Sequence, residues 1–300
     1  MIDFAGRTAF VTGGANGVGI GLVRALLAEG CKVAIADIRQ ESIDKALKML
    51  DNAEVMGIPV DVSSREGMAE AADEAESKFG PVSLLFNNAG VNLFQTIEES
   101  SYSDWDWLMG VNLHGPINGV MTFVPRMIAH GQGGYIVNTA SMAGWLANGN
   151  PGIYNTTKFA VRGMSESLRY SLAPHGIGVS CVCPGLVKSY IYASDDIRPD
   201  ALKTNAKPVN DEGVKRLAGM HEVGMEPDVI AARILQGMRE SQTYIFPMPD
   251  HKEELAEYFE EVIGDYRDYP QDPGYAERIA IEAFRRKSYK AAREAAKHAT

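Results

Sequence analysis

The strongest constraint on the fold is a short apolar run that passes directly into a glycine-rich turn and then into a helix. Residues 8–11 are typical of a buried strand, and Thr12-Gly13-Gly14-Ala15-Asn16-Gly17-Val18-Gly19 follows at once. Glycines in such a turn let the backbone approach a pyrophosphate group at the positive end of the next helix. The Gly-x-x-x-Gly-x-Gly spacing differs from the commoner dinucleotide pattern, and a purely structural turn is the alternative.

The alternation of strand and helix continues along the chain. Six more strands are predicted by apolar runs at residues 32–36, 55–60, 82–86, 135–139, 177–183 and 243–246. Between two of them lies a helical segment from Ser103 to Ala129, in which Pro116 and Pro125 should cause a kink or an end. Strands separated by helices predict an α/β fold of the Rossmann type, a doubly wound parallel sheet of about seven strands.

In a doubly wound sheet, ligands bind beyond the carboxyl ends of the strands. Asp37 ends the second predicted strand, where a carboxylate would accept hydrogen bonds from the ribose hydroxyls of adenosine and repel a 2′-phosphate. This position favours NAD over NADP, whereas the nearby Arg39 is the opposing signal. A helix N-cap before residues 41–50 is an alternative role for Asp37.

Tyr154 and Lys158 lie one helical turn apart and would share a face of their helix. A free phenol has a pKa of about 10, so making it a base near pH 7 needs about 4 kcal/mol. A cation at about 4 Å in a medium of effective dielectric about 20 supplies about 4 kcal/mol, before burial is subtracted. The pair is also typical of a solvated helix face, so its meaning depends on the other motifs.

Several motifs agree in both order and spacing: residues 12–19, Asn87-Asn88-Ala89-Gly90, Asn112, Ser141, Tyr154, Lys158 and Pro184-Gly185. This set resembles the short-chain dehydrogenase/reductase family over residues 4–248. The resemblance implies that Tyr154 is the general acid/base, that Ser141 binds the substrate oxygen, and that Lys158 binds the nicotinamide ribose and lowers the tyrosine pKa. Asn112, where the helix is locally disturbed, would hold a water that links Lys158 to solvent.

The resemblance further implies hydride transfer between a secondary alcohol or ketone and NAD, without a metal. The residues expected to contact the cofactor are Gly13, Asn16, Gly17, Val18, Gly19, Asp37, Ile38, Asp61, Val62, Asn88, Ala89, Gly90, Tyr154, Lys158, Pro184, Gly185, Val187 and Ser189.

A substrate-covering segment is expected at residues 186–224, again from the resemblance. With two other loops it would form an apolar, aromatic pocket lined by Val91, Leu93, Trp145, Tyr190, Ile191 and Tyr192, although ordinary packing would also explain each of them. Such a pocket favours a bulky aromatic substrate over a sugar. Segments 112–119 and 123–127, with the C-terminal extension, are similar to bacterial Cα-dehydrogenases of lignin-derived β-aryl ethers, which oxidise a benzylic alcohol. The alternatives are a dehydrogenase of steroid or terpenoid alcohols and a catalytically idle NAD(H)-binding sensor or scaffold.

The chain continues beyond the usual end of this fold, which predicts a dehydrogenase domain at 1–249 and a C-terminal helical extension at 250–300. The extension carries two apolar helical stripes, at 255–263 in an acidic helix and at 276–284 in a helix that ends basic. These helices would pair with one another, cap the active site or wrap a neighbouring subunit.

The expected partners are a small molecule and further copies of the chain. A net charge of −10 and a pI near 5.2 argue against nucleic acid and anionic membranes. The family resemblance suggests a homodimer or homotetramer. Three cysteines without metal-type spacing and the lack of a signal sequence or membrane-length apolar stretch predict a cytoplasmic protein.

Overall fold

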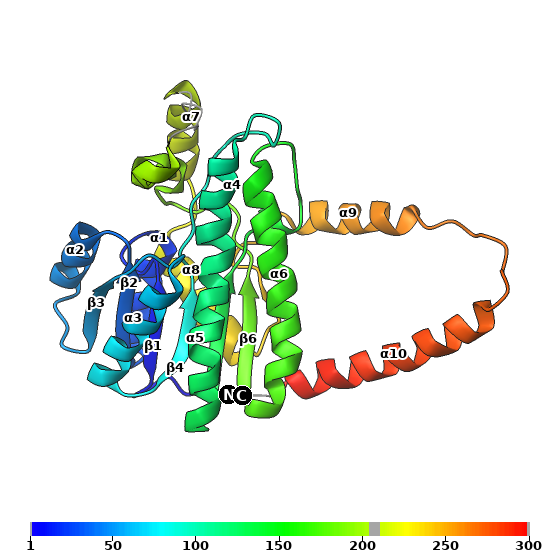
Figure 1. Cartoon of the computed structure of the whole chain (residues 1–300), viewed down its shortest axis with the longest axis horizontal. Helices are drawn as coiled ribbons and strands as arrows, with labels where there is room; N and C mark the ends of the chain where they lie inside the picture. Colours follow the sequence, from blue (N-terminus) through cyan, green and yellow to red (C-terminus); the bar gives the residue numbers. More distant parts are fainter. Residues whose placement is uncertain (1, 204–210, 299–300) are drawn as a thin grey trace.

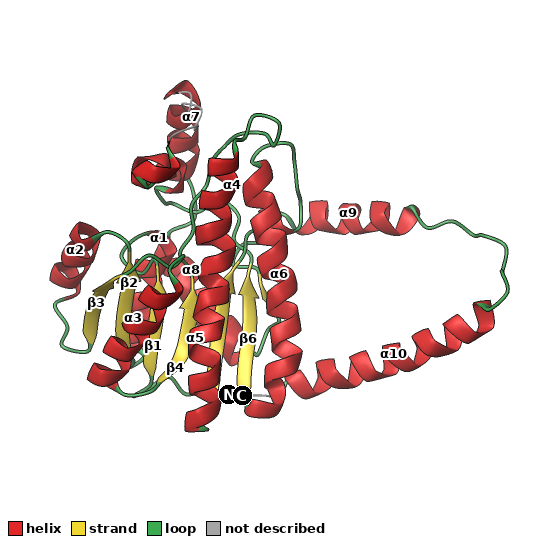
Figure 2. Cartoon of the chain, viewed as in Figure 1, coloured by secondary structure: helices red, strands yellow, loops and turns green. Residues whose placement is uncertain are grey.

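A computed structural model describes residues 2–203 and 211–298. Its centre is a seven-stranded sheet in the order β3-β2-β1-β4-β5-β6-β7, in which every neighbouring pair of strands is parallel. The strands are β1 (Thr8–Thr12), β2 (Lys32–Asp37), β3 (Val55–Pro59), β4 (Val82–Asn87), β5 (Gly134–Thr139), β6 (Ile177–Val182) and β7 (Tyr244–Ile245). The predicted fold class is confirmed, because each apolar run became a strand of one parallel sheet (Figure 2).

Helices cover both faces of this sheet (Figure 1). They are α1 (Gly17–Ala28), α2 (Gln40–Leu50), α3 (Arg65–Phe79), α4 (Tyr102–Met109), α5 (Gly115–His130), α6 (Gly152–Leu172), α7 (Asp211–Glu222), α8 (Pro227–Arg239), α9 (Lys252–Gly264) and α10 (Tyr275–Ala296). Short helical turns are η1 (Gly110–His114), η2 (Met142–Gly144), η3 (Ala173–His175), η4 (Ile191–Ile197) and η5 (Asp200–Leu202).

Side chains of each strand alternate between two hydrophobic cores. In β1, Val11 packs into the core beneath α1 and α8, whereas its neighbour Phe10 packs into the core beneath α3 and α5. The ring centres of Phe10 and Phe123, which lies in α5, are 4.7 Å apart. Because both faces are buried, the strand has no polar side to mark it in the sequence, which is why it reads as a continuous apolar run.

Helices α4 and α5 form one long rod that is interrupted by the π-helical turn η1. Pro116 and Pro125 were expected to kink this segment or to end part of it. Pro125 lies inside α5 and does not end it, because the helix continues to His130. The rod is disturbed at Gly110–His114, the turn around Asn112 that comes immediately before Pro116.

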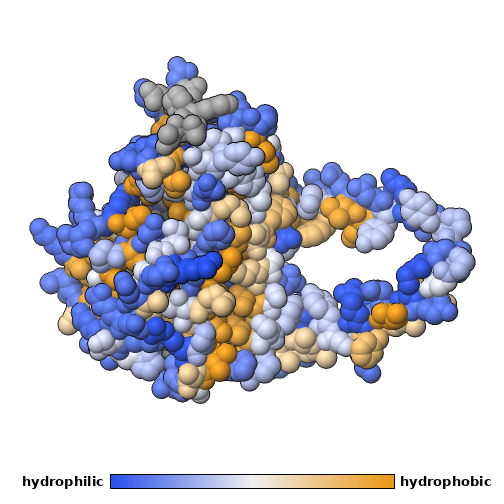
Figure 3. Space-filling view, viewed as in Figure 1, coloured by the Kyte–Doolittle hydropathy of each residue, from blue (hydrophilic) through white to orange (hydrophobic). Residues whose placement is uncertain are grey.

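The predicted C-terminal helices are present, and they project from the body as an arm, defined here as residues 252–296 (Figure 1). The arm leaves the sheet beside β7 through α9 and returns to the body through α10, whose Tyr289 packs edge-on against Tyr170 of α6 at 5.5 Å. An opening separates the two helices (Figure 3), so they do not pair side by side along their lengths. The boundary between domain and extension stays a prediction.

Candidate active site

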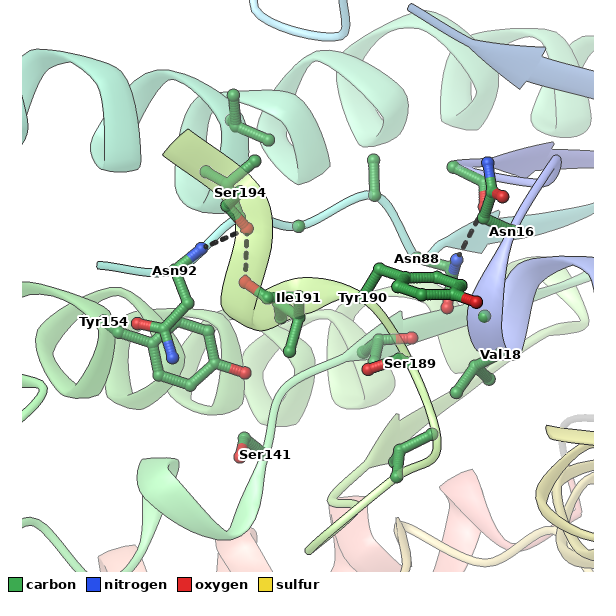
Figure 4. A pocket seen from close by; sticks show the side chains of 18 of the residues that line it. Asn16, Val18, Asn88, Asn92, Ser141, Tyr154, Ser189, Tyr190, Ile191 and Ser194 are labelled. Carbon is green, nitrogen blue, oxygen red and sulfur yellow. Dashed lines mark hydrogen bonds between the residues drawn. The ribbon is translucent and has the colours of Figure 1, made fainter. Parts of the chain in front are cut away.

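The carboxyl ends of the strands surround one cavity of about 640 Å³. Its walls come from the residues that follow β1 to β6 and from the segment that contains η4. Side chains from both ends of this cavity are seen in Figure 4, from Asn16 and Asn88 on one side to Ser141 and Tyr154 on the other. The cavity therefore lies where ligands bind in doubly wound sheets.

The turn after β1 is shaped by glycines whose Cβ atoms would have no room. Gly13 has a left-handed backbone, with φ of 61°, and a Cβ there would lie 2.8 Å from the Cα of Ala89. A Cβ at Gly19 would lie 2.0 Å from the carbonyl oxygen of Gly13. The amide Nδ2 of Asn16 is buried and has no hydrogen-bond partner in the described chain. A tight turn, a helix N-terminus and an unpaired donor together fit the pyrophosphate of a dinucleotide.

Asp37 is held at the tip of β2 with its carboxylate in place. One oxygen accepts a hydrogen bond from the backbone N–H of Ala15 at 3.3 Å and the other from that of Arg39 at 3.2 Å. Asp37 lines the cavity and is only 8% exposed. The N-cap of α2 is Arg39, so the alternative N-cap role of Asp37 does not hold, and the carboxylate is left to face the cavity. The exposed Arg39 also lines the cavity.

Ser141, Tyr154 and Lys158 come together at the other end of the cavity. The Nζ of Lys158 lies 5.3 Å from the centre of the Tyr154 ring and donates to the carbonyl oxygen of Thr139 at 2.9 Å. Ser141 follows β5 and accepts a hydrogen bond from the N–H of Ala143 at 3.1 Å. These contacts place an oxygen-binding hydroxyl, a phenol and an ammonium around one point, which is the set that proton removal from an alcohol requires.

Burial sets the pKa values of both titratable groups in this set. It raises the pKa of Tyr154 to about 12, while a hydrogen bond with Ser141 opposes the rise. It lowers the pKa of Lys158 to about 8, against the opposing effect of Cys181 and Cys183. Burial of the phenol therefore outweighs the hydrogen bond with Ser141, and the pKa of Tyr154 is raised rather than lowered in the chain alone. Further positive charge at this point, which oxidised nicotinamide carries, would favour the phenolate.

Asn112 is fully buried inside the π-helical turn η1. Its side-chain oxygen accepts from the N–H of Val91 and its amide donates to the carbonyl oxygen of Val91, both at 2.8 Å. A Cβ on Gly90 would lie 3.5 Å from Asn112 Oδ1 and 3.6 Å from Lys158 Nζ, so the two side chains meet beside Gly90. This accounts for an asparagine in mid-helix, while the water-mediated relay stays a prediction.

Comparisons with known proteins agree with this geometry. The family model described as short chain dehydrogenase matches residues 7–198. The chain belongs to the short-chain dehydrogenase family. The C alpha-dehydrogenase of Sphingobium sp. (strain NBRC 103272 / SYK-6) is 39% identical over 287 residues, which cover 95% of this chain and 94% of the relative.

Two solved structures are similar over almost the whole chain. A protein of Novosphingobium aromaticivorans assigned to the short-chain dehydrogenases is 60% identical, with a TM-score of 0.87, and the match covers 99% of this chain and all 100% of that one. A short-chain dehydrogenase/reductase of Burkholderia phymatum, solved in complex with NAD, is 33% identical with a TM-score of 0.85, over 91% of this chain and 99% of that one.

Most residues expected to contact the cofactor of this short-chain dehydrogenase line the cavity. They are Gly13, Asn16, Gly17, Val18, Asp37, Ile38, Asp61, Val62, Asn88, Ala89, Gly90, Tyr154, Lys158, Pro184, Gly185, Val187 and Ser189. Gly19 is the exception: it is buried against Gly13 and supports the turn from behind. The residues present thus fit a dinucleotide, and their individual contacts to it stay predictions.

The substrate end of the cavity needs a correction. Val91, Tyr190 and Ile191 line it as expected, whereas Leu93, Trp145 and Tyr192 do not. Trp145 is turned into a separate core, where its Nε1 donates to Cys183 Sγ at 3.2 Å and its ring meets Phe259 of the arm.

Leu93 and Tyr192 also lie outside the cavity lining, because each packs against other residues. Leu93 alternates away from its neighbours and packs under Trp107. Tyr192 packs beside His221 at 5.5 Å between ring centres. Three of the side chains that were expected in the substrate pocket, Leu93, Trp145 and Tyr192, therefore pack elsewhere in the protein.

The structure adds cavity residues that the sequence did not single out. They include Asn92, Phe94, Trp107, Val111, Met142, Pro151, Ser194, Ile197 and His221. Alternation along an extended segment groups Asn92 with Phe94 and separates both from Leu93, although Val91 lines the cavity as well. His221 is fixed by a hydrogen bond between its Nδ1 and the carbonyl oxygen of Val187 at 2.7 Å. His221 lies within the segment 186–224 that was expected to cover the substrate, although nothing in the sequence singles out this residue of α7.

Residues 2–203 and 211–298 contain no cluster of three or more His, Cys, Asp or Glu side chains suited to a metal ion. Over the same residues, no helix combines the length and apolar character needed to cross a membrane.

Proposed function

We propose that this short-chain dehydrogenase interconverts a secondary alcohol and a ketone with NAD, and that its substrate is bulky and aromatic. The observation that carries the proposal is the convergence of Ser141, Tyr154 and Lys158 at one end of a cavity whose other end fits a dinucleotide. The held carboxylate of Asp37 supports NAD over NADP, since it would repel a 2′-phosphate.

Each catalytic side chain has one task in the proposed reaction. Ser141 binds the substrate oxygen, and Tyr154 takes the hydroxyl proton as the carbonyl forms. Lys158 holds positive charge beside the phenol and binds the ribose. Bound NAD supplies the acceptor for the hydride that leaves the carbinol carbon. Oxidation of the alcohol thus yields a ketone, a reduced cofactor and one proton, and the reverse reaction consumes them.

The proposed substrate is an aryl carbinol such as the benzylic alcohol of a lignin-derived aryl ether. Apolar and aromatic side chains (Phe94, Trp107, Val111, Ile191 and Ile197) line the substrate end, and such walls suit flat rings better than a sugar. The similarity to a C alpha-dehydrogenase over 95% of the chain points to the same class. A steroid or terpenoid alcohol is the alternative for a wall of this kind, and an idle NAD(H)-binding sensor or scaffold is the alternative outside catalysis.

The test is the Tyr154→Phe variant, assayed with aryl carbinols, steroid alcohols and aliphatic alcohols against NAD and NADP. We expect turnover to fall below about one part in a thousand, because the proton acceptor is gone, while NADH binding persists. Appreciable residual turnover would sink the assigned role of Tyr154. Wild-type turnover of steroids alone would replace the aryl substrate, and binding of NADH without any turnover would favour the sensor.

We also propose that the chain works in the cytoplasm as a homodimer or homotetramer. The free, buried thiols of Cys31, Cys181 and Cys183 suit a reducing compartment. The arm exposes large apolar side chains, among them Ile263 at 66% and Phe284 at 73%, which a second copy would cover. Acidic α9 and the basic end of α10 would complement each other across a two-fold axis.

Removing residues 251–300 and measuring mass and activity tests this role of the arm. A smaller assembly would support a subunit interface, whereas lost activity at unchanged mass would support a lid. The cavity lining includes no arm residue in the described part of the chain, which favours the interface.

A further inference from the structure

One side chain of helix α7 is bonded to the backbone of a residue expected to contact the cofactor. His221, near the end of α7, is 9% exposed and lines the cavity. Its Nδ1 lies 2.7 Å from the carbonyl oxygen of Val187. A carbonyl oxygen only accepts hydrogen bonds, so Nδ1 carries a hydrogen and donates it. The donor of His221 is therefore committed to Val187.

Val187 belongs to a strip of chain that runs along the cavity from the reacting groups to the glycine turn. At one end of the strip, the carbonyl oxygen of Pro184 accepts a hydrogen bond from the hydroxyl of Ser141 at 3.4 Å. At the other end, a Cβ on Gly17 would lie 3.5 Å from the Cβ of Ser189. A dinucleotide with its pyrophosphate at the turn and its reacting ring at Ser141 would therefore lay its nicotinamide nucleoside along Val187.

The peptide groups on both sides of Val187 are fixed by the chain that follows α7. The N–H of Met225 donates to the carbonyl oxygen of Leu186 at 3.0 Å, and the N–H of Lys188 donates to the carbonyl oxygen of Met225 at 3.0 Å. A Cβ on Gly224 would lie 2.4 Å from the carbonyl carbon of Val187, so a glycine is required for this close approach of the two backbones.

His221 completes the hold on Val187 from the opposite side. In a parallel ladder one residue bonds to the two neighbours of the residue opposite it, so the N–H and carbonyl of Val187 face away from Met225. His221 binds the carbonyl, whereas the N–H of Val187 has no hydrogen-bond partner within residues 2–203 and 211–298. A backbone donor left free in a residue that lines the cavity suits an acceptor atom of the nicotinamide.

Ring packing does not account for a hydrogen-bond donor at this position. The ring centres of His221 and Tyr192 are 5.5 Å apart, a contact that any aromatic side chain would make. Without the N–H of His221, the carbonyl oxygen of Val187 would lose its partner in a buried place, and the peptide would turn to find another. The helix expected to cover the substrate thus holds the peptide that lies beside the cofactor.

We propose that His221 is a positioning residue for the nicotinamide end of NAD. It acts through the peptide of Val187 and takes no part in proton or hydride transfer. The inference rests on the proposed function only in placing nicotinamide at Ser141, and it concerns how the cofactor is held rather than which alcohol is chosen.

The test separates the nicotinamide end of the cofactor from the rest. His221→Phe keeps a ring beside Tyr192 and removes the donor. Affinities of the full chain for NADH and for ADP-ribose, which lacks nicotinamide, are measured by fluorescence and calorimetry. We expect His221→Phe to weaken NADH binding about 5- to 20-fold, as loss of one buried hydrogen bond does, and ADP-ribose binding less than about 2-fold. His221→Asn, whose amide N–H replaces that of Nδ1, should bind NADH within about 3-fold of wild type.

His175→Phe is the matched control, because His175 is exposed and does not line the cavity, and it should bind both ligands as wild type does. Equal loss of NADH and ADP-ribose in His221→Phe would mean that His221 only supports the fold. Unchanged NADH affinity in that variant, or no recovery in His221→Asn, would mean that its N–H positions nothing. Each of these results overturns the inference. Because both affinities are measured without an alcohol, a wild type that binds NADH and oxidises no alcohol would end the proposed function and leave the inference standing.

Discussion

The ion pair between Arg198 and Asp104 joins the substrate segment to α4, and breaking it is the sharpest test of how that wall is held. Both side chains are only 1% exposed. The guanidinium lies 4.9 Å from the ring centre of Trp107, and Asp104 also accepts hydrogen bonds from the N–H and hydroxyl of Ser101 at 2.7 and 2.8 Å. Burial raises the pKa of Asp104, but the hydrogen bonds from Arg198 and Ser101 outweigh it, so the net pKa is lowered.

Replacing Arg198 by Met leaves this carboxylate buried with only the uncharged partners Ser101 and Gln95 named for it in the described chain. Removing one member of a buried pair costs about 3–5 kcal/mol, so the free energy of unfolding should fall by that amount. For a domain of this size each kcal/mol is worth about 2–4 °C, which predicts a melting temperature lower by on the order of 10 °C. Thermal and urea denaturation at neutral pH, with turnover as a local readout, measure the effect.

The pH dependence of the free energy of unfolding independently tests whether Arg198 lowers the pKa of Asp104. In wild type the lowered pKa of Asp104 contributes stability above about pH 4 that is lost as the pH falls further. In Arg198→Met, desolvation favours the protonated acid, so the deficit relative to wild type should shrink as the pH falls from 7 to about 5.

Two further variants decide whether the pair itself is responsible. Asp104→Asn combined with Arg198→Met should recover part of the loss, since no charge is left buried. Lys203→Met removes an exposed pair with Asp200 and should cost less than about 1 kcal/mol. A cost below about 1 kcal/mol for Arg198→Met, or a double variant no more stable than the single one, would refute this reasoning.

Three other outcomes are expected. Asp37→Ser should lower kcat/KM with NAD about 10- to 100-fold and relax the discrimination against NADP, measured from the absorbance of the reduced cofactor; unchanged preference would mean that Arg39 decides it. Lys158→Met should move the rise of alcohol oxidation with pH to higher pH, because the phenol, whose pKa burial raises to about 12, loses its ammonium neighbour; an unshifted profile would contradict this. Ile263→Glu, on the exposed stripe of α9, should reduce the mass in solution at unchanged folding, and an unchanged mass would argue against the arm as an interface.

The sequence predicted the sheet because each buried strand had to be a short apolar run between turns. It also predicted where most cofactor-facing residues lie, since Gly13, Asp37 and Asn88 end or follow strands whose carboxyl ends meet at one edge. Asn112 marked the disturbance of its helix, because asparagine in mid-helix is unfavourable without a partner. Of the two prolines nearby, Pro116 lies directly after this disturbance, whereas Pro125 lies inside α5 without ending it, so a proline alone does not locate the end of a helix.

The substrate wall could not be predicted to the same depth, because it depends on contacts between distant segments. Trp145 contacts Cys183 and Phe259 of the arm instead of lining the expected pocket. Neither contact produces a local pattern in the sequence. The pair of Asp104 and Arg198 joins residues 94 positions apart. Local periodicity in the sequence indicates which side chains are buried. Tertiary packing determines which other residues they contact.

This difference also indicates where specificity can change without loss of chemistry. The cofactor end is built from backbone turns, in which a Cβ at Gly13 or Gly19 would meet other backbone atoms. The substrate end is built from side chains on three separately held segments, and the segment of Val91 and Asn92 is held by hydrogen bonds to the other two, at Asn112 and Ser194. A substitution of one lining side chain on these segments leaves Tyr154 and Lys158 in place. Substrate choice in this protein should therefore respond to single changes in the wall, for example at Phe94 or Ile191, whereas the chemistry should tolerate almost none at the glycine turn.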